Sequence, residues 1–205
     1  MRKKSLKFLV FLFLLASLSS FPDAWVFAQK PPAEGEIFPE LTLPLPNKVG
    51  EREYLMVEEG PFRISQIKAD VLIVEVFSMY CPYCQREASN TNALFQSLSS
   101  NPQLKARVKL IGIGAGNSAY EVNAFRTLYN IGFPLLPDPE LAIHKKLGEV
   151  RTPYFFVLRN KPDGSLQVVY SRVGSFGDPK VFLDMIKTKT GIGQDKKSPS
   201  KGERQ

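Results

Sequence analysis

Residues 71–87 read VLIVEVFSMYCPYCQRE, and the local signals in this stretch decide the fold. Residues 71–77 are β-branched and apolar over a strand's length, and they are dense enough for a strand buried on both faces. Helical spacing follows the second cysteine and predicts a helix to about Ser99, with an apolar face made of Ala88, Thr91, Leu94, Phe95 and Leu98. Cys81 and Cys84, the two cysteines of the chain, therefore lie at a strand-to-helix junction.

Two cysteines at this spacing could bind a metal, form a structural disulfide or act as a reactive pair. A zinc site needs about four ligands, whereas the chain adds only one histidine, His144, which has lysine neighbours on a predicted surface helix. A copper site would need further soft or imidazole ligands that the sequence does not place here, so we expect no metal. A bridge across two residues would constrain the unfolded chain very little. The spacing therefore favours a redox pair.

A helix start gives the two sulfurs different roles. Cys81 would lie beside unpaired backbone N–H groups and the positive end of the helix dipole, which favour the thiolate. Cys84, one turn into the helix, could attack a mixed disulfide on Cys81 and release the substrate. Pro82 holds the turn in helical geometry and brings no competing N–H. The redox group is then the Cys81–Cys84 disulfide, and we expect no bound cofactor.

Strand and helix signals alternate along the rest of the chain. Strands are predicted at 108–114 and 133–138, and residues 152–158 and 165–174 form a hairpin joined by the turn KPDG. Three helix starts carry capping signals: Ser118 with Glu121, Asp138 with Pro139, and Asp178 with Pro179, the last two helices ending near Gly148 and Gly191. This order predicts an α/β fold, with a mixed central sheet and helices on both faces.

The ends of the chain predict export. Residues 1–28 combine a basic start with a short apolar run and read as a secretory signal peptide, with an uncleaved membrane anchor as the alternative. Its removal takes four basic residues and one acidic residue, so the formal charge falls from +7 to +4, too little to indicate nucleic-acid binding. We predict a linker at 29–35, one domain at 36–190 and a disordered polar tail at 191–205. Leu41, Leu43 and Leu45 alternate, as in an edge strand or extended arm.

These motifs resemble the exported thioredoxin-fold thiol–disulfide oxidoreductases of the TlpA/ResA-like (redoxin) family. The resemblance runs from about Glu36 to Ile186 and rests on the strand leading into CPYC and on the Thr152–Pro153 pair about 70 residues later. It implies a thioredoxin-like fold with an extra αβ insertion between the CxxC helix and the strand that follows a cis proline. It also implies a cis peptide before Pro153, and substrate contacts from Thr152 and Pro153, together with Pro82 and Tyr83. The alternative for Pro153 is an ordinary proline at a strand start.

Two acids add to the resemblance. Glu75 lies six residues before Cys81, where thioredoxin-like proteins commonly carry a buried acid that could relay the proton of Cys84; its pKa should be raised. The alternative is a glutamate at a sheet edge or paired with a lysine. Glu87 matches an accessory acid of the ResA-like branch, but an exposed charge in the first helical turns would look the same. Tyr80 replaces the usual tryptophan before the motif, and the proline usual in the following helix is absent.

Several functions agree with these features. The first is a periplasmic or otherwise exported enzyme that exchanges disulfides with exported proteins, either as a reductase in cytochrome c maturation or as a Dsb-type oxidase or isomerase. A membrane protein would donate or accept its electrons. A thiol peroxidase is an alternative, since Ser78 and Arg151 fit that chemistry, although Val74 stands where its proline is expected. The non-enzymatic alternative is a thioredoxin-fold binding or chaperone module.

Overall fold

A five-stranded mixed sheet forms the centre of the computed structural model, which describes residues 30–193. Its strands are ordered β5 (Leu135–Asp138), β4 (Val108–Ala115), β3 (Val71–Phe77), β6 (Tyr154–Asn160) and β7 (Leu166–Val173). β3 pairs in parallel with β4 and antiparallel with β6, and every residue of β3 is buried. The dense apolar run thus becomes the central strand.

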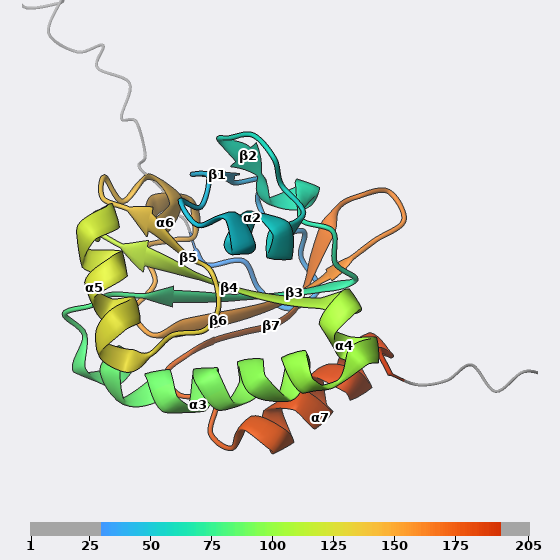
Figure 1. The fold of residues 1–205 in the computed structure, drawn as a ribbon. Coiled ribbons are helices and arrows are strands. Elements are labelled where there is room, and N and C mark those ends of the chain that lie inside the picture. Colours follow the sequence, from blue (N-terminus) through green and yellow to red (C-terminus); the bar gives the residue numbers. More distant parts are fainter. Residues whose placement is uncertain (1–29, 194–205) are drawn as a thin grey trace, which may run out of the picture.

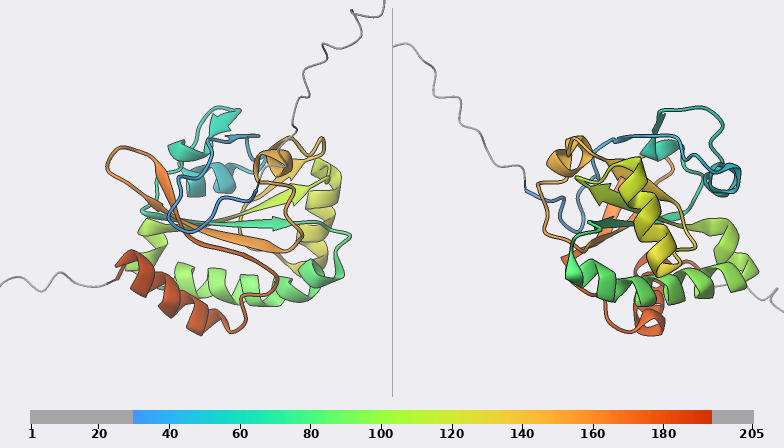
Figure 2. Two further views of the ribbon diagram at one scale, coloured as in Figure 1. Left: turned by 180° about the vertical axis from the view of Figure 1, so that it is seen from behind. Right: turned by 60° about the vertical axis from the view of Figure 1, so that its left-hand side comes forward.

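Helices cover both faces of the sheet (Figures 1 and 2). α3 (Pro82–Ser100) and α7 (Pro179–Thr190) lie side by side on one face, with α4 (Pro102–Arg107) at the end of α3 and α5 (Ala119–Tyr129) beside β5. The other face carries α2 (Val49–Leu55), α6 (Ala142–Lys146), the short helix η1 (Ile64–Gln66) and a two-stranded sheet of β1 (Thr42–Leu43) and β2 (Phe62–Arg63). Each face has its own apolar core. The predicted α/β class and the layering are confirmed.

Capping signals located two of the three predicted helix starts correctly, those of α5 and α7. In α5, Ser118 and Glu121 form the predicted capping box, and in α7 the Asp178 carboxylate accepts hydrogen bonds from the N–H groups of Lys180 and Val181. Gly191 ends α7 in the left-handed region, at φ +71°. Each of these signals acts within one turn of its helix, so it can be recognised without tertiary contacts.

The prediction was wrong at Asp138. This residue ends β5, and α6 begins only at Ala142, so Pro139 is not its first helical residue. The Asp138 carboxylate instead reaches forward to accept hydrogen bonds from the N–H groups of Ile143 and His144, at 3.1 and 2.8 Å. The carboxylate still caps the helix, but across an intervening turn that the local pattern does not indicate.

Both ends of the described residues pack on the domain beyond the predicted limits of 36–190. Gly35 N–H donates to the carbonyl oxygen of Val168 in β7 at 2.8 Å, and Ile192 is 2% exposed, in the core beside α7. Apolar burial and strand pairing thus include part of the predicted linker and the first residues of the predicted tail. The predicted signal peptide and the rest of the tail lie outside the described residues. Within residues 30–193, no helix combines the length and apolar content needed to cross a membrane.

Candidate functional site

Cys81 stands at the N-cap of α3, directly before Pro82 at the first helical position. The side chain of Cys81 is half-buried. Partial burial and donation by the thiol to the Thr152 carbonyl oxygen, at 3.2 Å, both favour the neutral form. Hydrogen bonds from the Thr152 side chain, from the thiol of Cys84 and from the backbone N–H groups of Tyr83 and Cys84 outweigh them and lower the pKa of Cys81. The helix start therefore favours the thiolate.

Cys84 lies one turn further along α3, beneath the surface. It is fully buried in the core between the sheet and the helices α3, α5 and α7. Burial raises the pKa of its thiol well above the ordinary value, and the nearby charge of Glu75 raises it further. The two cysteines thus differ in both access and acidity, in the direction that the sequence predicts.

Thr152 and Pro153 lie across from the cysteine pair, at the start of β6. Their peptide bond is cis, as the resemblance implies. Contact with the pair is direct, since the thiol of Cys81 reaches the Thr152 carbonyl oxygen. The Pro153 carbonyl oxygen accepts a hydrogen bond from Gly174 N–H at 2.8 Å, which ties this segment to the end of β7. Four of the predicted site residues are thereby brought together, namely Cys81, Cys84, Thr152 and Pro153.

Glu75 lies on β3 with its side chain on the α3 side of the sheet, among alternating core residues such as Ile73 and Phe77. It is 3% exposed, and β3 is a central strand, so the alternatives of a sheet edge and a lysine partner do not hold for the described residues. Burial raises the pKa of Glu75 to about 8, and the charge of Glu87 contributes to the increase. A carboxyl that titrates near neutral pH can exchange protons with its neighbours.

Glu87 is also buried, at 3% exposure, so the alternative of an exposed helix position is wrong. Its Oε1 accepts a hydrogen bond from Phe176 N–H at 3.2 Å, and its Oε2 accepts one from the Asn90 side chain at 3.2 Å. Phe176 belongs to the loop between β7 and α7, where its ring stacks on Phe182 at 4.4 Å. Glu87 therefore joins the CxxC helix to a loop far away in sequence, and that contact leaves no local pattern.

The exposed rim of the pair carries aromatic side chains. Tyr83 is 66% exposed, and the guanidinium of Arg86 lies 4.5 Å from its ring centroid. Tyr80, also 66% exposed, donates a hydrogen bond to the Glu121 carboxylate. Of the predicted substrate-binding residues, Pro82 and Tyr83 thus face solvent beside Cys81, while Pro153 lies beneath.

Sequence reasoning missed the side chains that hold the turn before Cys81. Asn117, in the corner between β4 and α5, accepts a hydrogen bond from Met79 N–H at 2.8 Å. Gln85 donates to the Met79 carbonyl oxygen at 2.9 Å. The available signal was topological: β3 and β4 are parallel neighbours, so the residues that follow them meet at the same edge of the sheet.

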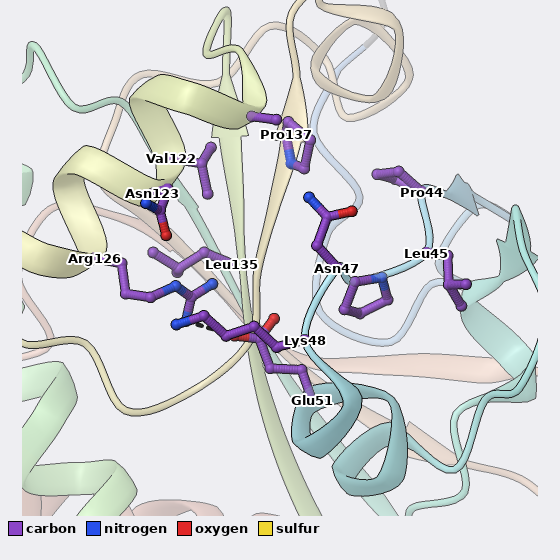
Figure 3. A pocket seen from close by; sticks show the side chains of 12 residues that line it. Pro44, Leu45, Asn47, Lys48, Glu51, Val122, Asn123, Arg126, Leu135 and Pro137 are labelled. Carbon is purple, nitrogen blue, oxygen red and sulfur yellow. Dashed lines mark ion pairs between the residues drawn. The ribbon is translucent and has the colours of Figure 1, made fainter.

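A separate pocket of about 170 Å³ lies between the segment that leads into α2, β5 and α5 (Figure 3). Within it, Arg126 and Glu51 form an ion pair at 2.8 Å, with both side chains largely buried. Neither cysteine lines this pocket. The two charges satisfy each other, and Arg126 also donates to the Phe133 carbonyl oxygen at 2.9 Å, so the pair joins α2 to α5.

No cluster suited to a metal occurs in residues 30–193, since nowhere do three or more His, Cys, Asp or Glu side chains converge. The imidazole of His144 forms a hydrogen bond with the Val150 carbonyl oxygen at 2.8 Å, in the turn after α6. His144 therefore has a local structural partner, away from the cysteine pair.

The sequence matches the AhpC/TSA family over residues 35–167, more than half of the 205 residues. The chain belongs to the AhpC/TSA family. This assignment confirms the predicted redoxin family and supports the prediction of an oxidoreductase. A sequence comparison with curated proteins gave no match.

Solved structures similar to this AhpC/TSA member share its fold at low sequence identity. A candidate protein disulfide isomerase from Bacteroides thetaiotaomicron has a TM-score of 0.58 at 17% identity, covering 78% of this chain and 90% of its own. A candidate thiol:disulfide interchange protein DsbE from Chlorobium tepidum has a TM-score of 0.58 at 14% identity, covering 78% and 99%. StoA from Bacillus subtilis has a TM-score of 0.51 at 16% identity, covering 73% and 97%. The predicted thioredoxin-like fold is confirmed.

Proposed function

We propose that this protein is an exported thiol–disulfide oxidoreductase that exchanges disulfides with other exported proteins through Cys81 and Cys84. The proposal rests on the difference in access and acidity between the two cysteines. One sulfur is accessible at a helix start and has a lowered pKa, whereas the other is buried and has a raised pKa. The names of the similar structures, an isomerase and an interchange protein, support the same reaction class.

Exchange proceeds in two balanced steps when the protein acts as a reductant. The Cys81 thiolate attacks one sulfur of the substrate disulfide, a mixed disulfide forms, and the other substrate sulfur leaves as a thiolate and takes up a proton. Cys84 then loses its proton and attacks Cys81, which releases the second substrate thiolate. Two electrons pass from the Cys81–Cys84 dithiol to the substrate, and the protein is left as the disulfide. The oxidase direction reverses these steps.

The surrounding residues assist proton transfer and bind the substrate. Glu75 takes the proton from Cys84 in the second step, because its charge acts on that thiol and it titrates near neutral pH. Glu87 is an accessory acid whose charge raises the pKa of Glu75. Thr152 and Pro153 line one side of the accessible sulfur, and Pro82 with Tyr83 lines the other, so an extended substrate segment would bind between them.

Reduction in support of cytochrome c maturation is the more specific form of this proposal. It requires a membrane protein that supplies electrons, and export rests on the signal-like residues 1–28. A Dsb-type oxidase or isomerase is the alternative. The reduction potential of the Cys81–Cys84 pair, measured against glutathione, separates them: a strongly reducing value supports the reductase, and a high value supports the oxidase or isomerase.

An insulin-reduction assay tests the reaction class. The wild-type protein is expected to accelerate insulin reduction by dithiothreitol, and Cys81→Ser to abolish the acceleration. In a separate incubation without dithiothreitol, reduced Cys84→Ser is expected to accumulate a mixed disulfide with insulin that is visible on a non-reducing gel, because the resolving sulfur is missing. Equal activity of wild type and Cys81→Ser would refute thiol exchange at this pair and leave the binding-module alternative.

A thiol peroxidase is the second candidate, favoured by the AhpC/TSA family match itself. Its test is peroxide consumption with dithiothreitol as the reductant. Consumption that requires Cys81 and survives Cys84→Ser would place the peroxidase ahead of disulfide exchange. Consumption no faster in the wild type than in Cys81→Ser would remove it.

A further inference from the structure

The turn that presents Cys81 is held by side chains from two neighbouring elements. Cys81 N–H donates to the Ser78 carbonyl oxygen at 3.1 Å, which closes the turn. Inside it, Met79 uses both of its peptide groups: its N–H donates to Asn117 at 2.8 Å, and its carbonyl oxygen accepts from Gln85 at 2.9 Å. The backbone two residues before the nucleophile is thus fixed from the β4–α5 corner and from α3.

Asn117 is an unusual residue to find at this position. It is fully buried, and its Nδ2 has no hydrogen-bond partner among residues 30–193. An unpaired buried donor costs about 1–3 kcal/mol, whereas an apolar side chain would carry no such cost. What the amide provides is its oxygen, the acceptor for Met79 N–H. The backbone N–H of Asn117 donates to the Gly114 carbonyl oxygen at 3.0 Å, so the residue that carries this acceptor is anchored to the end of β4.

Glu121 performs two tasks with one carboxylate. Its Oε2 accepts hydrogen bonds from the backbone N–H and the hydroxyl of Ser118, at 2.7 and 2.8 Å, which begins α5. Its Oε1 accepts the hydroxyl of Tyr80, the residue directly before Cys81. The bond raises the pKa of the phenol and lowers the pKa of the carboxyl. An exposed aromatic ring that could otherwise turn freely is therefore held in one orientation.

We propose that Asn117, Gln85 and Glu121 are positioning residues for thiol exchange. Asn117 and Gln85 fix Met79 so that the Cys81 sulfur stays beside the N–H groups at the start of α3, and Glu121 fixes the Tyr80 ring as a wall against which the partner chain binds. The proposal rests on the proposed function and extends it to the β4–α5 corner. A preorganised wall reduces the entropy lost when the partner binds.

The alternative is that these side chains only stabilise the fold. The chain offers variants that separate the two roles. Tyr80→Phe removes the bond to Glu121 and leaves the capping box of α5 intact. Gln85→Ala removes one bond to Met79 from a partly exposed helix position, so it should fold even if Asn117→Ala does not. Asp178→Ala removes the N-cap of α7, away from the cysteines, and costs about 1 kcal/mol as a matched loss of stability.

Alkylation of Cys81 by iodoacetamide tests Asn117 and Gln85 without any protein substrate. It is followed as a function of pH in a Cys84→Ser background, after thermal melting has shown which variants fold. Asn117→Ala and Gln85→Ala are each expected to raise the midpoint of the profile by about half a unit to one unit, and to slow alkylation near pH 7 by about three- to tenfold, because the thiolate fraction falls with rising pKa. Asp178→Ala is expected to match the parent. Profiles that coincide with the parent in every folded variant would overturn the positioning role.

Steady-state insulin reduction tests Glu121 through Tyr80. Tyr80→Phe and Glu121→Ala are each expected to raise KM about three- to tenfold with kcat nearly unchanged, and the double variant is expected to be no worse than either one, since both remove the same interaction. Asp178→Ala controls for the loss of a helix cap that Glu121→Ala also causes. Additive effects, or no change in KM, would overturn the role of Glu121. If the wild-type protein does not reduce insulin, the proposed function is refuted instead. The alkylation profiles would still show whether the turn positions Cys81.

Discussion

Glu75 is a buried acid on the central strand of the sheet, and its charge acts on the thiol of Cys84. Its place in an apolar run, six residues before Cys81, predicted a buried acid with a raised pKa, and both features are present. The burial of Glu87 could not be predicted, because the covering contact comes from Phe176, 89 positions away in sequence. A pattern of helical spacing shows which face a residue occupies, but it does not show which loop covers that face.

Glu75 should make the stability of the fold depend on pH. Its pKa is raised from 4.5 to about 8 by burial, so the folded state binds the proton more tightly than the unfolded state. The stabilisation is complete below pH 4.5 and is lost as pH rises through about 8. Glu75→Gln cannot ionise, so it escapes this loss. The free energy of unfolding of Glu75→Gln minus that of the wild type should therefore increase between pH 5 and pH 9, by on the order of 5 kcal/mol.

Urea unfolding of both proteins across this pH range measures the effect. Glu53→Gln, at an exposed position of α2, is the control and should follow the wild type. Parallel curves for wild type and Glu75→Gln would contradict the raised pKa.

The same substitution should also slow the second chemical step. If Glu75 accepts the proton of Cys84, Glu75→Gln should slow resolution of the mixed disulfide on the order of 100-fold while leaving its formation unchanged. Rapid mixing with a chromogenic disulfide separates the two phases. A resolution rate equal to wild type, with the same pH profile, would assign Glu75 a purely structural role.

Elements were easiest to predict where their signals are local. The capping box of α5 and the Asp-Pro start of α7 are correct, whereas α2 and α4 were missed and α6 was placed too early. α2 contributes only Leu55 to the buried residues, so it has little apolar periodicity to read. The turn between Asp138 and α6 is held by bonds that skip several residues, which no spacing rule captures.

β4 depends on a glycine for its fit between the neighbouring strands. A Cβ at Gly112 would lie 2.4 Å from Leu135 Cδ2 and 3.2 Å from the Phe77 ring. Gly112→Ala should therefore lower the free energy of unfolding by about 1–3 kcal/mol through overpacking. Gly50→Ala in α2 is the control, because its Cβ would meet no atom within 4 Å and the change should be neutral or slightly stabilising. Equal unfolding midpoints for the two variants in guanidinium would contradict the close packing.

The N-terminal arm, residues 34–45, is part of the domain. Phe38 is 3% exposed and packs against Phe156 at a ring distance of 5.1 Å, and Glu34 pairs with Lys189 of α7 at 2.6 Å. The sequence showed alternation only in the residues that follow, Leu41, Leu43 and Leu45, and it did not show that residues 35–38 would pair with β7. That pairing depends on the free edge of β7, which exists only once the sheet has formed.

Truncating the Phe38 side chain should therefore lower the stability of the whole fold. Phe38→Ala is expected to lower the free energy of unfolding by about 3–5 kcal/mol, because it leaves a cavity against β6. Its neighbour Ile37 is 55% exposed, so Ile37→Ala should change stability by no more than about 0.5 kcal/mol. Thermal melting of the two variants measures the difference. Similar melting temperatures for both would mean that the arm is not integral to the core.

The burial of Cys84 also determines how the cysteine pair would respond to small oxidants. A small oxidant reaches Cys81, whose thiolate is the form that oxidises, but it does not reach the sulfur beneath. The first product, a sulfenic acid on Cys81, has Cys84 as its nearest thiol and would condense with it to the disulfide before further oxidation becomes irreversible. Oxidative damage and normal turnover would therefore lead to the same product, the Cys81–Cys84 disulfide, which can be reduced again. The buried cysteine in this way protects the exposed one.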